Sequence, residues 1–393
     1  MISFDEACLR LANLAEPLPP EMVSLEEADG RVLAQDIMAA CDSPAHAVSA
    51  MDGYAIRDSE LKAGRTSWPV GREVYAGDGP PGELPAGVCA RIFTGAPLPA
   101  GFDRVVPQEL VRATAEGVSL DPHLLSSSHI RQAGSDFRAH QVLLRRGRTM
   151  DPGALLLAAA ADRPHVLVSC RPRISIISSG DELVAPGTAL DRPGRVPDSV
   201  SFGVASLARQ WGAGVVRRRR AQDDLVTLRR AVSEEQANAD LIVMTGGASV
   251  GERDYARAAF EQLELIVDKV AMKPGKPVWV GRSKNRLVVG LPGNPTAAMV
   301  TARLFLAPLL AALGGRSPSE AWAWRDAPAG RPFAPTGDRE VFVRARMNGD
   351  SVHPCDNQDS SAQAVMGEWT LLARRAPASP GLASGAMVGV LPL

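Results

Sequence analysis

Apolar and polar residues alternate with different periods along the chain, and the first segment has a helical period. Ser3 and Glu6 form a capping box, and apolar residues recur three or four positions apart through residues 3–14. This pattern predicts an amphipathic helix at the start of the sequence. A second capping box, at residues 24–27, predicts another short helix that Gly30 can end.

Residues 46–142 have a different character, because short apolar runs stand between turn-forming residues. Runs such as Val105-Val106 are separated by proline- and glycine-rich stretches at residues 77–82 and 95–99. The sequence has no long helical period here. The segment is therefore predicted to be irregular and mostly β.

From about residue 173 to 315, apolar runs typical of buried strands alternate with segments of helical period. Strands are predicted at 174–177, 215–216, 241–244, 278–280 and 287–289, and helices at 204–211, 225–232, 253–263 and from Pro295 onward. Repeated β-α-β units predict an α/β fold with a mainly parallel, doubly wound sheet and helices on both faces. After residue 320 the pattern returns to short strands, at 341–346, 371–373 and 387–391.

These changes of pattern divide the chain into four parts. An N-terminal linking domain is predicted from residues 1–45 and 143–172, with a β-rich domain of residues 46–142 inserted into it. An α/β domain of residues 173–318 follows, and a small β-barrel-like domain covers residues 319–393. The length supports a division, because 393 residues exceed the size of a single hydrophobic core.

Composition and charge narrow the class of protein. The chain is 45% hydrophobic and 22% charged, with a formal net charge of -1. These values indicate a globular protein and favour neither nucleic acid nor an anionic membrane as a partner. The five cysteines are odd in number and lack metal-ligand spacing, so free thiols in a reducing cytoplasm are expected.

Three further segments bear on location and surface. The N-terminus lacks the basic stretch of a signal peptide. The apolar run at residues 296–313 is long, but it contains Arg303 and Pro308 and is therefore predicted to be a core helix. The basic run from Arg217 to Arg220 is interpreted as a solvated strand end.

Three loops follow predicted strands of the α/β sheet, at residues 178–183, 245–254 and 290–295. Ligands of open α/β sheets bind beyond the carboxyl ends of the strands. Glycines let the backbone approach a ligand, and the following helices offer free N–H groups, so the loops predict phosphate sites rather than simple tight turns. The candidate ligand-binding residues are Ser179, Gly180, Asp181, Thr245, Gly246, Gly247, Ser249, Gly251, Pro292, Gly293 and Asn294.

Carboxylates gather at the same predicted edge, namely Asp181, Glu182, Asp223, Asp224 and Asp254. Each can instead cap a helix or be a solvated charge. Their collection beside phosphate sites nevertheless predicts Mg²⁺ or another divalent cation, which proteins hold with one or two carboxylates and phosphate oxygens. Glu182 and Asp254 are the predicted metal ligands.

A stiff cationic loop occupies residues 272–277, where two prolines and a glycine surround Lys273 and Lys276. Two like charges in a rigid loop indicate an oxyanion ligand rather than a plain exposed turn. From the residues alone, the chain is predicted to be a phosphate- and metal-using α/β enzyme with flanking β-rich domains. Its substrate is not specified by these patterns.

Four stretches resemble, in this order, the molybdopterin molybdenumtransferase family, MoeA, which includes the E domain of gephyrin. They are Ser49 to Ala55, Arg91 to Pro99, Gly246 to Tyr255, and Lys273 to Pro277 with Leu291 to Pro295. The first two stretches are highly specific to this family, whereas the glycine loop is shared with MogA-type adenylyltransferases and CinA-type proteins. The resemblance covers essentially the whole chain.

The resemblance implies that the protein binds adenylylated molybdopterin and molybdate, releases AMP in a divalent-metal-dependent step, and leaves molybdenum on the dithiolene sulfurs. It also implies an elongated homodimer, with each active site between the α/β domain of one subunit and the β segment of the other. A MogA-type adenylyltransferase is a candidate partner. By motif, the family's functional polar residues correspond to Asp52, Thr94, Asp136, Glu182, Asp223 and Asp254. Its molybdate-side groups correspond to Lys273, Lys276 and Ser360, with Arg339 or Arg344.

Several positions depart from the family pattern. Ala47 and Val48 replace the usual residues before the Ser-Ala-Met-Asp motif, and Ala297 replaces a usual serine. Asp359 stands where a glycine is usual, and Val365 stands where a serine is expected. A negative charge beside an oxyanion site is unfavourable, so the molybdate site is the part of the resemblance that these departures affect most.

Two other functions agree with parts of the sequence. An adenylyltransferase or nucleotide pyrophosphatase can use the same α/β domain, but it would need neither the Asp52 and Thr94 motifs nor the C-terminal β domain. A catalytically reduced interaction scaffold, as the gephyrin relationship allows, is supported only by the departures near Val48 and Asp359. Molybdate-dependent release of AMP would distinguish these functions.

Overall fold

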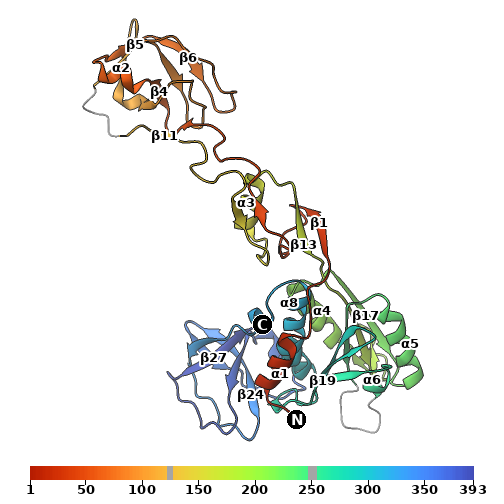
Figure 1. The fold of residues 1–393 in the computed structure, drawn as a ribbon. Coiled ribbons are helices and arrows are strands. Elements are labelled where there is room, and N and C mark those ends of the chain that lie inside the picture. The colour runs from red at the N-terminus through yellow and green to blue at the C-terminus, as the bar shows by residue number, and fades with distance from the viewer. Residues whose placement is uncertain (122–126, 247–254) are drawn as a thin grey trace.

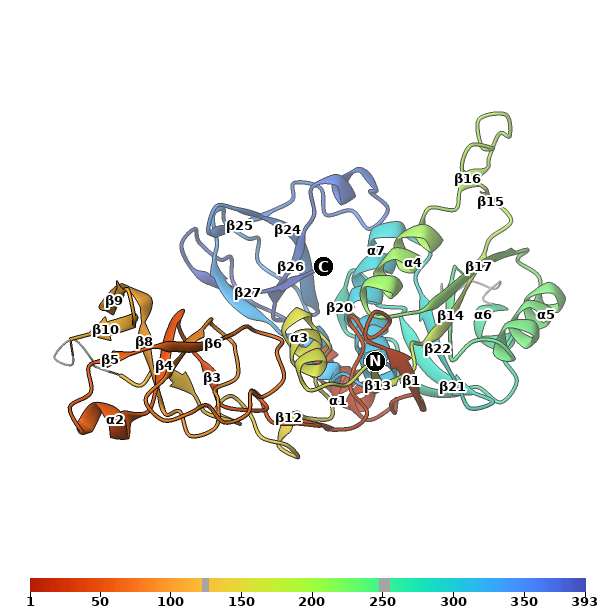
Figure 2. The same ribbon diagram turned by 90° about the horizontal axis from the view of Figure 1, so that it is seen from above.

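The computed structural model describes residues 1–121, 127–246 and 255–393, which form an elongated molecule (Figure 1). We call residues 1–19 and 171–393 the body, residues 20–45 and 143–170 the neck, and residues 46–142 the distal lobe. The distal lobe and the body lie at opposite ends, and the neck lies between them in both views (Figures 1 and 2).

A six-stranded sheet forms the centre of the body, in the order β17-β14-β18-β22-β21-β19. Its first four strands are parallel to one another, and β21 is antiparallel to both of its neighbours, β22 and β19. The strands are β14 (Arg173–Ser179), β17 (Val215–Ala221), β18 (Leu241–Thr245), β19 (Glu264–Asp268), β21 (Trp279–Ser283) and β22 (Arg286–Leu291). The predicted mainly parallel α/β fold is confirmed. The pattern did not predict β19, because Val267 is its one fully buried residue.

Helices cover both faces of this sheet, because alternate residues of its strands are buried on opposite sides. On β14, Ile176 packs against α4 (Val200–Gln210) and its neighbours, whereas Ile177 packs against α5 (Leu225–Gln236). Helix α6 (Tyr255–Ala258) lies on the same face of the sheet as α5. It is shorter than the helix predicted at 253–263, and residues 253 and 254 of that prediction lie outside the described residues.

A long helical segment runs through the body from Pro295 to Leu313, and 94% of an 18-residue window within it is buried inside the protein. It comprises α7 (Pro295–Thr301), the π-helical turn η3 (Ala302–Leu306) and α8 (Ala307–Leu313). Arg303 is buried, and its guanidinium donates to the carbonyls of Ala321 and Pro392. Burial lowers the pKa of Arg303 to about 10, so the side chain remains charged at neutral pH. The prediction of a core helix is confirmed.

The C-terminal sheet packs on the other side of this helix in the order β20-β24-β26-β27-β23, with β25 beside β24. Its strands are β20 (Met272–Lys273), β23 (Arg325–Pro328), β24 (Glu340–Asn348), β25 (Ser351–Pro354), β26 (Leu371–Arg375) and β27 (Met387–Pro392), with the turns η4 (Pro318–Trp322) and η5 (Ala364–Gly367). Because β20 belongs to the lysine loop, that loop is built into the C-terminal sheet.

Helix α1 (Phe4–Ala12) joins the two parts of the body. Ser3 caps it by accepting the N–H of Glu6, as the capping box predicted. Phe4 is buried between Phe305 and Phe342, with ring centroids 5.9 and 4.8 Å away. The first helix of the chain therefore packs on the body, while the four domain boundaries stay a prediction.

The neck is built on the antiparallel pair β1 (Pro20–Ser24) and β13 (His165–Ser169), with α3 (Pro152–Ala160), β2 (Ile37–Met38) and β12 (Val142–Leu144). The predicted helix at residues 24–27 is wrong. Ser24 does donate from its N–H and hydroxyl to Glu27, at 3.2 and 2.9 Å. Because Ser24 also ends β1 opposite His165, this contact closes a turn rather than a helix.

The distal lobe is mostly β, as predicted. Its main sheet has the order β6-β7-β4-β8, and a second sheet has the order β5-β10-β9. The elements are β3 (Val48–Ser49), β4 (Gly53–Ile56), α2 (Asp58–Lys62), β5 (Ser67–Trp68), β6 (Val70–Val74), β7 (Cys89–Ile92), β8 (Arg104–Pro107), η1 (Gln108–Leu110), β9 (Val111–Thr114), β10 (Gly117–Leu120) and β11 (Ile130–Arg131).

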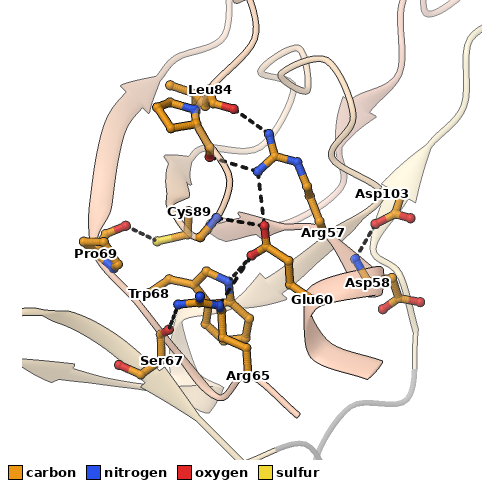
Figure 3. A network of polar contacts seen from close by, with 12 residues as sticks. Arg57, Asp58, Glu60, Arg65, Ser67, Trp68, Pro69, Leu84, Cys89 and Asp103 are labelled. Atoms are coloured by element: carbon orange, nitrogen blue, oxygen red, sulfur yellow. Dashed lines mark hydrogen bonds and ion pairs between the residues drawn. The ribbon is translucent and has the colours of Figure 1, made fainter. Parts of the chain in front are cut away.

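A polar network around Glu60 ties the two sheets of the lobe together (Figure 3). Glu60 accepts the Trp68 indole N–H at 2.7 Å and the Gly87 backbone N–H at 2.9 Å. Burial alone would raise the pKa of Glu60, but these bonds and Arg57 hold it below its usual range. The carboxylate is therefore ionised at neutral pH, where it can accept both bonds.

Replacing Phe4 by alanine is expected to destabilise the body by about 3–5 kcal/mol, the usual cost of removing a buried phenylalanine. The reason is the loss of ring contacts with Phe305 and Phe342. Urea unfolding monitored by tryptophan fluorescence would measure the change. Leu9→Ala, on the exposed side of the same helix, is the matched control and should cost less than about 0.5 kcal/mol. Equal effects of the two substitutions would contradict the assigned packing.

Candidate active site

The loops after β14, β18 and β22 meet at the carboxyl edge of the body sheet. A hollow of about 400 Å³ there is lined by Ser179 and Glu182 from the first loop, Thr245 and Gly246 from the second, and Gly293 from the third. We call it the sheet-edge groove. The structure thus brings together residues of all three predicted phosphate loops, as the rule for parallel strands requires.

Gly246 shows how closely two of these loops approach. Its φ is +84°, and a Cβ at this position would lie 2.2 Å from the carbonyl oxygen of Ser179. Gly293 lies against it as well, since a Cβ there would be 3.7 Å from the Gly246 Cα. A side chain at position 246 would therefore force the loops apart.

Two aspartates of the predicted set hold the first loop in place. Ser179 donates its hydroxyl hydrogen to Asp223 at 2.7 Å, and the Asp223 backbone N–H donates to Asp181 at 3.1 Å. The adjacent Asp224 caps α5 through the Thr227 N–H at 2.9 Å. Its bonds to Thr227 lower the pKa of Asp224. Asp224 is therefore a helix cap, the alternative that the sequence left open.

Glu182 differs from these aspartates, because its exposed carboxylate has no hydrogen bond or ion pair within the residues that the structure describes. Those residues also contain no group of three or more possible metal ligands. A divalent ion that shares a phosphate needs only one or two carboxylates, so Glu182 at the groove fits such an ion. Asp254, Gly247, Ser249 and Gly251 lie outside the described residues.

A loop of the C-terminal domain closes one side of the groove. Asn294 donates from its amide to the Ser360 hydroxyl at 3.0 Å, and the Thr296 backbone N–H donates to the Ser360 carbonyl at 3.2 Å. Ser361 and Gln363 from the same loop line the groove. The sequence analysis did not predict Thr296, Ser361 or Gln363 as site residues. The buried Thr296, a polar residue that opens an apolar helix, was the available signal.

The lysine loop lies against the same helix. Gly275 has a φ of +107°, and a Cβ there would be 2.3 Å from the Thr301 methyl group of α7. Lys273 pairs with Val341 at the start of β24. Both Lys273 and Lys276 are exposed, and across the described ranges neither ammonium group has a hydrogen bond or ion pair. Two free cations are thus held beside α7.

Arg344 on β24 is fully buried, yet its Nε and Nη1 atoms have no partner among the described residues. Its closest acceptor contact is from Nη2 to the Asn357 carbonyl at 3.5 Å. Burial lowers the pKa of Arg344. Free donors on a buried guanidinium favour a bound anion, whereas Arg339 is only partly buried and lies 3.8 Å from Asp338. Of the two predicted arginines, Arg344 thus combines burial with donors that lack a partner among the described residues.

Asp359, the unusual residue of this region, has a local structural role. Its carboxylate accepts the Ser361 backbone N–H at 2.8 Å and the Ser361 hydroxyl at 2.7 Å. These bonds, and secondarily Arg344, lower the pKa of Asp359. The negative charge is present, and it is engaged in shaping the loop that carries Ser361. Of the other departures, Ala297 and Val365 are buried in the packing of α7 and η5.

The remaining predicted residues lie outside the body. Thr94 donates to Asp52 from its backbone N–H at 2.7 Å and from its hydroxyl at 2.8 Å. Both are exposed in the distal lobe, and these bonds lower the pKa of Asp52. Asp136 is exposed near the neck, where its N–H donates to the Ser43 carbonyl. Figure 1 places the distal lobe far from the strand ends of the groove, so one chain does not bring these residues together with Glu182.

The chain is similar to known proteins both in sequence and in fold. Residues 2–161 match the MoeA N-terminal region (domain I and II), and residues 175–312 match a probable molybdopterin binding domain. The molybdopterin molybdenumtransferase of Haemophilus influenzae is 34% identical over 319 residues, covering 80% of this chain and 78% of that protein. That of Synechococcus elongatus is 33% identical over 367 residues and covers 90% of both. Two solved MoeA structures from Pyrococcus horikoshii have TM-scores of 0.85 and 0.83, at 25% and 22% identity, and cover 100% of this chain.

The fold and these matches define a class: multidomain transferases of molybdenum cofactor biosynthesis, built on a molybdopterin-binding α/β domain. Within that class, the chain belongs to the molybdopterin molybdenumtransferase family. The resemblance found in the sequence motifs is therefore confirmed. The adenylyltransferase alternative is not favoured, since the match extends through residues 2–161 as well as the α/β domain.

Thr94→Val should raise the pKa of Asp52 toward the ordinary aspartate value. The substitution removes the hydroxyl bond to the ionised carboxylate but keeps the bond from the backbone N–H, so a partial return is expected. Because the pKa of Asp52 is depressed in the native protein, the Asp52–Thr94 contact should be complete at neutral pH and weaken as the pH falls through that pKa. Carboxyl NMR titration would measure both values. An unchanged pKa in the variant would contradict the assigned contact.

Proposed function

We propose that this protein inserts molybdenum into adenylylated molybdopterin and releases AMP. Family membership supports this activity, but one observation carries it: α7 joins the sheet-edge groove to the lysine loop. Gly293 lines the groove just before the helix, Asn294 holds the Ser360 loop, and Thr301 contacts the lysine loop. A reaction that needs both a phosphate link and molybdate requires such neighbouring sites.

The phosphate link is proposed to lie in the sheet-edge groove. Ser179 and Thr245 offer hydroxyl groups there, and Gly246 allows the backbone to come close to the ligand. Glu182 would hold a divalent cation such as Mg²⁺ against the phosphate oxygens, where the cation offsets charge on the leaving AMP phosphate. Asp223 keeps Ser179 in position through their hydrogen bond.

Molybdate, the second substrate, is proposed to bind at the seam between the α/β part and the C-terminal sheet. Lys273 and Lys276 supply exposed cations, and Arg344 supplies buried free donors. Ser360 contributes a hydroxyl that is fixed by Asn294. Charge-assisted contacts of this kind suit a tetrahedral dianion.

The complete active site is proposed to form in a homodimer. Asp52 and Thr94 are exposed in the distal lobe, and the elongated chain holds them away from its own groove (Figures 1 and 2). A second copy can supply its lobe to this groove, and twofold symmetry would then create two equal sites. Asp136, which belongs to the distal lobe and lies near the neck, would be supplied to the site together with Asp52 and Thr94.

The same proposal includes a cellular setting. The five cysteines are free, as suits a reducing cytoplasm. The substrate is an adenylylated pterin, so an enzyme of the MogA adenylyltransferase type is the proposed supplier.

Subunit complementation would test the shared site directly. Asp52→Asn and Glu182→Gln should each abolish molybdate-dependent AMP release. A purified heterodimer of these two variants should recover about half of the wild-type rate, because one of its two symmetric sites carries neither substitution. The matched control is a heterodimer of Glu182→Gln and Asp223→Asn, in which every site carries one substitution and no recovery is expected. A recovery that is absent from the first pair, or equal in both, would contradict a site built from two chains.

Lys273→Ala should raise the molybdate concentration needed for half-maximal turnover by about ten-fold or more, because a charge-assisted contact to an anion is lost. The KM for adenylylated molybdopterin should stay nearly constant. Lys284→Ala is the control, since that lysine is paired with Glu261 at the surface. An effect of Lys273→Ala on the nucleotide-bearing substrate alone would assign the loop to the phosphate link instead.

A further inference from the structure

A second polar hollow lies beside the sheet-edge groove. Its volume is about 780 Å³, and its lining includes the arginines Arg192, Arg195 and Arg220. Gly180 and Leu183 also line it, and Leu183 lines the groove as well. The Gly180–Leu183 loop is therefore the wall between the two spaces. Of these arginines, the sequence analysis singled out only Arg220, as part of a basic run interpreted as a solvated strand end.

The three arginines come from two separate elements. Arg220 lies near the carboxyl end of β17, opposite Ser178 in the strand register and one position before the pair of Ser179 and Ala221. Arg192 and Arg195 lie on an arm between β15 (Leu183–Val184) and β16 (Val196–Pro197), two strands that pair in parallel. Figure 2 shows this arm rising from the body above the edge strand β17.

The arginines of β17 differ in their side-chain partners, and Arg220 is unlike Arg218 and Arg219 in this respect. Arg218 lies over the Phe202 ring at 3.5 Å, and Arg219 forms an ion pair with Glu234. Arg220 has no ion pair or side-chain hydrogen bond in the described part of the chain, and the same holds for Arg192 and Arg195. The interpretation of the run as a solvated strand end is therefore incomplete, because Arg220 faces a hollow with two further arginines.

The charge of the hollow favours an anion. Among the described residues, Asp181 is its one acidic lining residue, and that carboxylate already accepts the Asp223 N–H at 3.1 Å. The three arginines are exposed and line one hollow without carboxylate partners among the described residues, and guanidinium groups in this setting bind phosphate through charge-assisted hydrogen bonds. The volume lies within the range of about 300–1,000 Å³ that is usual for small-ligand sites, which leaves room for a nucleoside attached to the phosphate.

We propose that this arginine hollow is a product-side subsite that binds the phosphate of the nucleotide after its link to the pterin has been cleaved. The proposal rests on the proposed function for the identity of the nucleotide, AMP. The Gly180–Leu183 loop borders both spaces, so the hollow is the neighbouring space that a phosphate can enter on leaving the groove. Arg220, Arg192 and Arg195 would hold it away from the reacting link.

Calorimetric titration of the full-length protein with AMP, adenosine and inorganic phosphate would test the subsite. Arg220→Gln and the double variant Arg192→Gln/Arg195→Gln should each weaken AMP binding about ten-fold or more. Adenosine should bind weakly to all variants, because it lacks the phosphate. Inorganic phosphate should compete with AMP in the wild type, which would place both phosphates at the same site, and a lower Kd for AMP than for phosphate would identify the nucleotide as the tighter ligand.

Arg217→Gln is the matched control, because Arg217 is an exposed neighbour on β17 that does not line the hollow. Unchanged AMP affinity in the Arg220 and Arg192/Arg195 variants, or an equal loss in Arg217→Gln, would overturn the subsite. Molybdate-dependent AMP release by the wild type is measured separately. Its absence together with arginine-dependent AMP binding would refute the proposed function and leave the subsite standing, whereas normal release with arginine-independent binding would do the reverse.

Discussion

The buried helical segment from Pro295 to Leu313 is the constraint on which the rest of the body depends. It is almost wholly enclosed, so every element around it must fit its surface. Its first turn fixes the loop of Gly293 and the Ser360 contact, its middle supports the lysine loop through Thr301, and its π-helical turn carries the buried Arg303. The groove loops and the lysine loop are thereby held at fixed positions relative to one another by apolar packing.

The polar side chains of the candidate site are of two kinds: those that form hydrogen bonds within the protein and those that do not. Asp181, Asp223 and Asp224 are consumed in shaping loops and caps, while Glu182, Lys273 and the buried donors of Arg344 are left available for ligands. A buried donor without a partner costs stability, and this cost applies to the fully buried Arg344. The retention of such donors is therefore a physical argument for a ligand-binding role of Arg344.

The period of apolar residues predicted the body well, because strands such as β14 and β18 are buried on both faces and form continuous apolar runs. Local signals failed where tertiary pairing decided the outcome: the contact of Ser24 with Glu27 is present, yet strand pairing of Ser24 with His165 makes it a turn. The three loops of the groove were predicted because each directly follows a strand of the parallel sheet. Ser361, Gln363 and the arginine hollow did not, because their positions depend on contacts between segments far apart in the sequence.

The two edges of the body sheet show how the fold avoids uncontrolled association. An edge strand exposes unpaired backbone groups that can recruit a strand from another molecule. At β17, the run from Arg217 to Arg220 places like charges along that edge, so a second copy approaching it in the same way would be repelled. At β19, the first helix of the chain lies against the strand, and Arg10 donates to the carbonyl of Ile266. Helix α1 thus covers the edge strand β19. A chain that lacks this helix would expose the unpaired backbone groups of β19 and would be prone to aggregate through them.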